Sequence, residues 1–153
     1  MKASKLAHHV FKLAYKYHVK VIQSHSALAQ CAKVEHRLSA LLAANPSHYV
    51  GCSNFTKRTI ILSAPITKPE HYAIALHELG HIASLNQHHL RTATEAARDQ
   101  LLNNGNIMKA NEIGAWKWAK ATALYWTPVM EAQKEWCLST YGVSTKTKKE
   151  QVA

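Results

Sequence analysis

The segment ALHELGHIASL, residues 75–85, places two histidines and one glutamate in a run that is otherwise apolar. In a helix, His77 and His81 lie one turn apart on the same face, and Glu78 lies beside them. This is the H-E-x-x-H arrangement, in which two neutral imidazoles bind zinc and the glutamate accepts a proton from water. The composition of the chain predicts roughly 0.04 chance occurrences of the bare motif. We therefore interpret His77 and His81 as Zn²⁺ ligands and Glu78 as a general base.

A catalytic zinc site needs a third protein ligand and keeps one position open for water. The metzincin extension of the motif requires Gly at 84 and His at 87, where this chain has Ser84 and Gln87. Glu112 is the preferred candidate, because it shares one helix stripe with the apolar residues Ala115, Trp116, Ala119, Ala123 and Trp126, and a lone carboxylate there needs a cation. Two alternatives stay open: Glu112 is an acid favoured by a helix dipole, or Glu95 is the third ligand.

A peptidase of this kind also needs a group that stabilises the oxyanion of the tetrahedral intermediate. Spacing does not choose among the candidates, which are Tyr49, Tyr72, His88, His89, Tyr125 and Tyr141. That role stays unassigned.

The elements that must position these residues are read from hydrophobic periodicity and from start and stop signals. Helices are predicted over residues 4–22 and 26–44, from near Lys68 through the motif, and over 92–102, 107–126 and 128–141. Two strands, HYVGCSNF and RTIILSAP, are expected to form a small antiparallel sheet. T-x-x-E capping boxes at Thr67 and Thr92 predict the starts of two of the helices.

Charge and composition bound the class of protein. The chain has 153 residues and a formal net charge of +10, which favours anionic partners such as nucleic acid or an acidic protein segment. A basic stripe on the first helix (Lys5, His9, Lys12, Lys16 and Lys20) is the best nucleic-acid candidate. A solvated helix face is the simpler interpretation, because aromatic residues for base stacking are not interleaved with these lysines.

No apolar run approaches the roughly 20 residues that cross a bilayer, so no contact with a membrane is expected. The three cysteines (Cys31, Cys52 and Cys137) are too few and too widely spaced for a disulfide framework or a zinc ribbon. Reduced, buried thiols and a cytoplasmic location are the expectation.

Two segments resemble the ImmA/IrrE-type zinc metallopeptidases and the related single-domain minigluzincins: RTIILSAPITKPEHYAIALHELGHIASL and NEIGAWKWAKATALYWTPVM. In the second, Glu112, Ala115, Trp118 and Ala119 match an E-x-x-A-x-x-F-A-like helix that ends near Pro128. The resemblance implies a gluzincin-type endopeptidase with His77, His81 and Glu112 as zinc ligands and Glu78 as base. It also implies a phage or mobile-element setting and cleavage of a regulatory protein.

Together these observations predict an α+β, zincin-like single domain over residues 1–143, followed by a basic flexible tail at 144–153. In it, TIILSA is expected to be an edge strand that aligns an extended peptide substrate. The predicted function is zinc-dependent hydrolysis of a peptide bond. One alternative is a slow or inactive zincin-fold adaptor, antirestriction-like, that binds nucleic acid or protein. A weaker alternative is a structural virion protein with a vestigial site.

Overall fold

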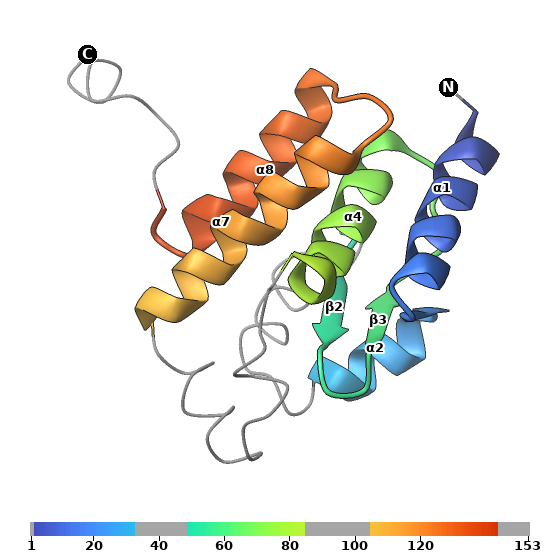
Figure 1. Ribbon diagram of the computed structural model, residues 1–153, viewed down its shortest axis with the longest axis horizontal. Coiled ribbons are helices and arrows are strands. Elements are labelled where there is room, and N and C mark those ends of the chain that lie inside the picture. Colours follow the sequence, from blue (N-terminus) through green and yellow to red (C-terminus); the bar gives the residue numbers. More distant parts are fainter. Residues whose placement is uncertain (1, 33–48, 85–104, 144–153) are drawn as a thin grey trace.

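The computed structural model describes residues 2–32, 49–84 and 105–143. Within these residues the chain is α+β, with five helices and a three-stranded mixed sheet (Figure 1). In chain order the elements are α1 (Ala3–Lys16), β1 (Lys20–Gln23), α2 (His25–Ala32), β2 (Gly51–Asn54), β3 (Thr59–Leu62), α4 (Pro69–Ala83), α7 (Gly105–Thr122) and α8 (Pro128–Thr140).

The sheet has the strand order β1-β3-β2. β2 and β3 are antiparallel, with Cys52 opposite Ile61, so the predicted pair of strands is confirmed. β1 and β3 are parallel, with Val21 opposite Ile60. The prediction that TIILSA is an edge strand is wrong, because β3 pairs on both sides and is the central strand. β2 is an edge strand of this sheet. No strand of the described residues pairs with its outer side.

The first helix is shorter than the predicted range 4–22. α1 ends at Lys16, and His18 adopts a left-handed conformation with φ 56°. The Val19 amide donates to the Ala14 carbonyl oxygen at 2.8 Å, as in a Schellman-type helix end. The β-branched residues Val21 and Ile22 then enter the sheet. Helical periodicity could not reveal this strand, because its partner β3 lies far away in the sequence.

α4 is the central helix of the fold. It lies between the sheet and the pair α7 and α8, with α1 alongside (Figure 1). The apolar side of α4 belongs to the core, since Tyr72, Ala75, Leu76 and Leu79 are completely buried. Its polar side is buried as well: His77 and Glu78 are each only 7% exposed. The metal motif therefore lies inside the protein rather than on an open helix face.

α2 covers the other face of the sheet. Leu28 of α2 packs with Val50 and Cys52 in a second, smaller core cluster. Cys31 and Cys52 meet there with their sulfur atoms 3.2 Å apart and without a disulfide bond. The sheet is thus enclosed by helices on both faces, and only its edges remain for pairing with another chain.

The predicted starts of α4 and α8 are confirmed to within one residue. The contact predicted to cap α4, however, is not the one that forms. Thr127 caps α8, since its hydroxyl accepts a hydrogen bond from the Met130 amide at 3.2 Å. α4 begins after Lys68, whose side chain makes no capping bond. The T-x-x-E capping box at Thr67 is wrong: the Thr67 amide donates to the ring of His71, not to Glu70. α7 also ends at Thr122 rather than at residue 126.

Several predictions fall outside the described residues. They are the second part of the helix over 26–44, the helix over 92–102 with its capping box at Thr92, and the tail at 144–153. Within the described part of the chain, no helix combines the length and the apolar character needed to cross a membrane.

Candidate metal centre

Two helices bring the candidate ligands together. α4 carries His77, Glu78 and His81, and α7 carries Glu112. Where the helices meet, a Cβ atom built on Gly80 would lie 2.6 Å from the Ala115 carbonyl oxygen. Any residue other than glycine at position 80 would therefore force the backbone to shift. Glycine at position 80 therefore permits the close approach that places Glu112 against the histidines.

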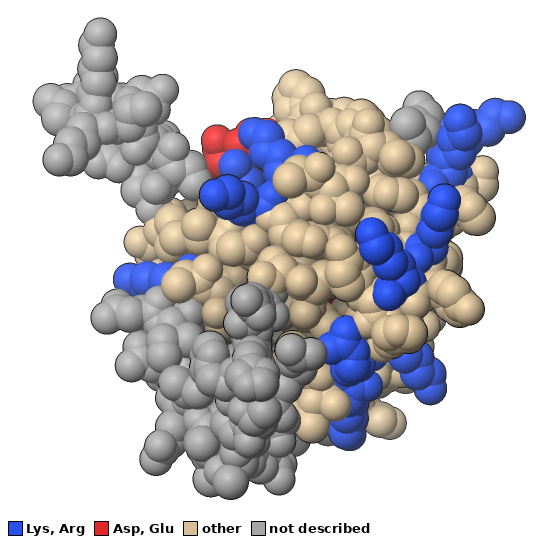
Figure 2. All heavy atoms as spheres, in the orientation of Figure 1, with Lys and Arg blue, Asp and Glu red and all other residues tan. Residues whose placement is uncertain are grey.

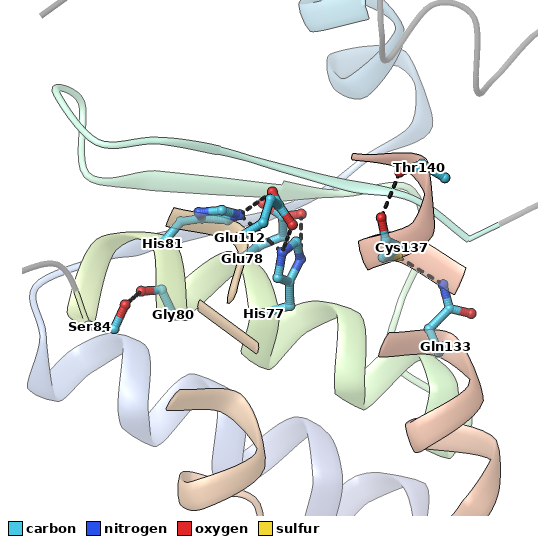
Figure 3. Close-up of polar contacts among 9 residues, drawn as sticks. All are labelled: His77, Glu78, Gly80, His81, Ser84, Glu112, Gln133, Cys137 and Thr140. Atoms are coloured by element: carbon cyan, nitrogen blue, oxygen red, sulfur yellow. Dashed lines mark hydrogen bonds and ion pairs between the residues drawn. The ribbon is translucent and has the colours of Figure 1, made fainter. Parts of the chain in front are cut away.

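The side chains of His77, His81 and Glu112 converge on one point (Figure 3). The Nε2 atom of His77 lies 2.8 Å from Oε2 of Glu112, and the Nε2 atom of His81 lies 2.9 Å from Oε1. The two Nε2 atoms are 3.0 Å apart. Glu112 is 3% exposed, and His81 is partly buried. Three side chains with donor groups of the kinds that bind zinc thus form a compact triangle inside the protein.

Glu78 lies beside this triangle. Its Oε1 atom is 3.2 Å from Nδ1 of His77, and His77, Glu78 and His81 form a group whose ligand atoms all lie within 4.8 Å of one another. Its Cγ atom packs against β2: a Cβ atom on Gly51 would lie 2.8 Å from it. The edge strand β2 therefore packs against the side chain of Glu78, the residue that the sequence predicts to be the base.

His77 and Glu112 shift each other's pKa in this buried space. Burial alone lowers the pKa of His77, but the carboxylates of Glu112 and Glu78 outweigh burial and raise that pKa well above its ordinary value. Burial alone raises the pKa of Glu112, whereas the two histidines lower that pKa well below its ordinary value. The two carboxylates thus favour positive charge at His77.

The donor set fits a divalent cation. With both ring nitrogens protonated, His77 can donate to two carboxylates, to Glu112 through Nε2 and to Glu78 through Nδ1. A cation held by both Nε2 atoms and by Glu112 would supply positive charge in place of the Nε2 proton, and it would leave the Nδ1–H group of His77 to donate to Glu78. Two imidazoles and one carboxylate are the ligands of one class of catalytic zinc site.

Trp116 forms a wall of the site. Its ring stacks on the imidazole of His77, with the ring centroids 4.3 Å apart and the planes at 13°. Trp116 is 1% exposed, and its indole nitrogen has no hydrogen-bond partner among the described residues. The stack fixes the orientation of His77 and surrounds it with apolar atoms, which strengthens the charge interactions of the imidazole.

The structure bears on the two alternatives for the third ligand. Glu112 lies about two turns beyond the start of α7, so the helix dipole, which acts within the first turn, does not account for it. As predicted for its stripe, Ala115, Trp116 and Ala119 are buried, and Lys117 and Lys120 on the other face are exposed. Glu95 lies outside the described residues.

The candidates for oxyanion stabilisation gain no support. The Tyr49 hydroxyl donates to the Ala64 carbonyl oxygen at 2.8 Å. The Tyr72 hydroxyl contacts the His9 ring at 2.6 Å and accepts from the Leu124 amide at 3.0 Å. His88 and His89 lie outside the described residues. The role remains unassigned.

Sequence patterns missed three residues of the site: Trp116 as the stacking partner of His77, Gly51 as the neighbour of Glu78, and Gly80 at the helix crossing. Gly80 carried a signal, because glycine inside a helix costs about 1 kcal/mol relative to alanine and so indicates a packing requirement. The contacts of Trp116 and Gly51 join distant segments and leave no local trace in the sequence.

No family model, no curated protein and no solved structure matches the chain. His77, Glu78 and His81 form a group that could hold a metal ion. A second buried glutamate, Glu112 of α7, contacts both histidines.

Proposed function

We propose that this protein is a zinc-dependent endopeptidase of gluzincin type, with a zincin-like fold. His77, His81 and Glu112 hold the metal, and Glu78 is the general base. The observation that carries the proposal is the meeting of both Nε2 atoms with the Glu112 carboxylate at 2.8 and 2.9 Å, inside the protein and beside a fourth titratable group. The sequence resemblance to ImmA/IrrE-type metallopeptidases supports the same assignment of roles.

The chemistry follows from these positions. When bound, zinc acts as a Lewis acid that lets water lose a proton near neutral pH, although free water has a pKa of about 15.7. Glu78 would accept this proton while the water oxygen bonds to the carbonyl carbon of the substrate, and it would then give the proton to the amine nitrogen as the C–N bond breaks. Glu112 and the two histidines would hold the metal ion in a fixed position. The stack of Trp116 on His77 keeps the site rigid.

The edge strand β2 is the element that would align the substrate. An extended peptide could add to the outer side of β2 by backbone hydrogen bonds, as in other strand-addition complexes. Gly51 in this strand touches Glu78, so a peptide paired there would run past the base. This role replaces the one expected for TIILSA, which lies in the interior of the sheet.

Glu78→Gln tests the proposal, with the exposed Glu135→Gln as a control of equal charge change. Zinc-loaded protein is incubated with a peptide library, with and without a chelator, and the products are identified by mass spectrometry. Cleavage by the parent and by Glu135→Gln is expected to stop with the chelator. Glu78→Gln is expected to keep its zinc and to lose about 10²–10⁴-fold in rate.

The possible results separate two failures. A parent protein that holds zinc but cleaves nothing would end the peptidase proposal and leave the metal site. Unchanged cleavage by Glu78→Gln would end the assignment of the base. An inactive, metal-binding adaptor is the second candidate function, favoured by the exposed lysines of α1.

A further inference from the structure

The outer face of α1 is strongly basic. Its exposed lysines are Lys5, Lys12 and Lys16; exposed Lys2 precedes the helix, and exposed Lys20 follows in β1. The first acidic residue of the chain is Glu35, so no carboxylate lies among residues 2–32. Figure 2 shows Lys and Arg gathered over α1 along one side of the molecule, while the visible acidic atoms lie over the helices at the far side. This face presents positive charge without local compensation.

Aromatic rings accompany these lysines. Phe11 is 41% exposed and Tyr15 is 87% exposed, and they lie one helical turn apart. Each precedes a lysine of the stripe, Lys12 and Lys16. The helix turns its Leu6, Val10 and Ala14 side inward, so both rings remain outside, on the flank of the lysine stripe.

Covering two exposed rings with a partner removes apolar surface from water, which favours binding. No described residue covers Tyr15, which makes it the most exposed of the large hydrophobic side chains in the described part of the chain. Lysines suit phosphate groups, and aromatic faces suit unstacked bases. α1 is about 20 Å long, which is enough for several nucleotides of a single strand.

We propose that the outer face of α1 binds single-stranded nucleic acid, with its lysines on the phosphates and with Phe11 and Tyr15 stacked on bases. This inference does not depend on the proposed peptidase. A duplex keeps its bases stacked and would meet only the lysines. An anionic membrane is disfavoured because a helix lying in the interface inserts its apolar side, and that side of α1 is occupied by the protein core.

Fluorescence anisotropy with labelled oligo(dT), oligo(U) and a DNA duplex of equal length, each over a series of salt concentrations, tests the proposal. Both single strands are expected to bind more tightly than the duplex. In the variant Lys5→Gln/Lys12→Gln/Lys16→Gln, the slope of log affinity against log salt is expected to fall by about 2 for the single strands.

The matched control is Lys68→Gln/Lys109→Gln/Lys117→Gln, which removes the same charge at three exposed lysines of other elements. It is expected to bind like the parent. Equal losses in both triple variants would show a general effect of net charge and would overturn the assignment to α1.

Tyr15→Ala tests the stacking step, since the side chain is exposed and its removal leaves the core intact. A loss of about tenfold or more for single strands, with no change for the duplex, is expected. No binding by the parent, equal binding of duplex and single strand, or binding only to phosphatidylserine vesicles or to a poly-glutamate peptide would overturn the proposal.

Discussion

Gly80 of α4 faces the backbone of Ala115 in α7 so closely that a Cβ atom at position 80 would lie 2.6 Å from the Ala115 carbonyl oxygen. This contact sets the separation of the helices that carry the histidines and Glu112. Alanine at position 80 would therefore have two opposing effects: it improves helix propensity, and it forces these helices apart.

Gly80→Ala is therefore expected to destabilise the protein. Overpacking costs about 1–3 kcal/mol, whereas the gain in helix propensity is only about 1 kcal/mol. Moving α7 away also withdraws Glu112 from the histidines and weakens zinc binding. Denaturant unfolding and zinc titration measure the two effects.

Gly114→Ala is the matched control, because a Cβ atom there meets nothing within 4 Å. It is expected to leave zinc binding unchanged and to stabilise the protein slightly. Equal zinc affinity in Gly80→Ala and Gly114→Ala would contradict the role of the helix crossing.

Gly51→Ala is expected to impair catalysis and to leave the metal bound. The new methyl group would lie 2.8 Å from Cγ of Glu78, so it must displace the side chain proposed as the base. The three atoms nearest to that methyl group belong to Glu78, Leu62 and Ile74, and none of these residues is a proposed metal ligand. Zinc content and the rate of peptide cleavage, measured on the same sample, check this; loss of zinc together with activity would contradict it.

Removal of zinc is expected to lower the thermal stability of the protein. At a free zinc concentration one hundred times Kd, binding adds about 2.7 kcal/mol to the folded state, which corresponds to about 5–10 °C in Tm. Thermal melting with zinc and with a chelator measures the shift. A shift of the same size in Glu112→Gln would show that zinc stabilises the protein from another site.

The ion pairs of Glu131 predict a loss of stability in acid. Burial raises the pKa of Glu131, but hydrogen bonds from three donors, Lys134, Trp126 and Lys120, lower it to about 2, from an ordinary value of 4.5. The unfolded chain therefore binds this proton more readily than the folded protein. The stabilisation is complete above pH 4.5 and is lost as the pH falls toward 2.

Glu131→Gln removes this dependence. Unfolding free energies of parent and variant, measured between pH 7 and pH 3, are expected to converge as the pH falls. The difference is small and declines with salt, because the carboxylate is partly exposed. A difference that stays constant with pH would contradict the assignment.

The sequence predicts the parts of the site that depend on local spacing. His77 and His81 stand on one helical face, and the apolar stripe of α7 identifies Glu112, because both patterns follow from helix geometry. The motif lies inside the protein, because α4 is buried on nearly every side. Burial of its polar side depends on α7 and β2, which no local pattern reveals.

The errors in the fold have related causes. Residues 20–23 continue a helical period in the sequence, yet they form a strand because β3 offers them a partner. The turn before them depends on a left-handed His18, a position at which glycine would have given a recognisable signal. The central place of β3 follows from this one missed strand.

The metal content of purified variants tests the central claim most directly. The experiment compares four proteins: the parent, Glu112→Ala, Glu95→Ala and the exposed-site control Glu135→Ala. All four are dialysed against the same concentration of zinc, and their metal content is measured by elemental mass spectrometry. About one zinc ion per chain is expected in the parent, in Glu95→Ala and in Glu135→Ala, and almost none in Glu112→Ala. A full zinc content in Glu112→Ala, with loss only in Glu95→Ala, would contradict the claim that His77, His81 and Glu112 hold one ion.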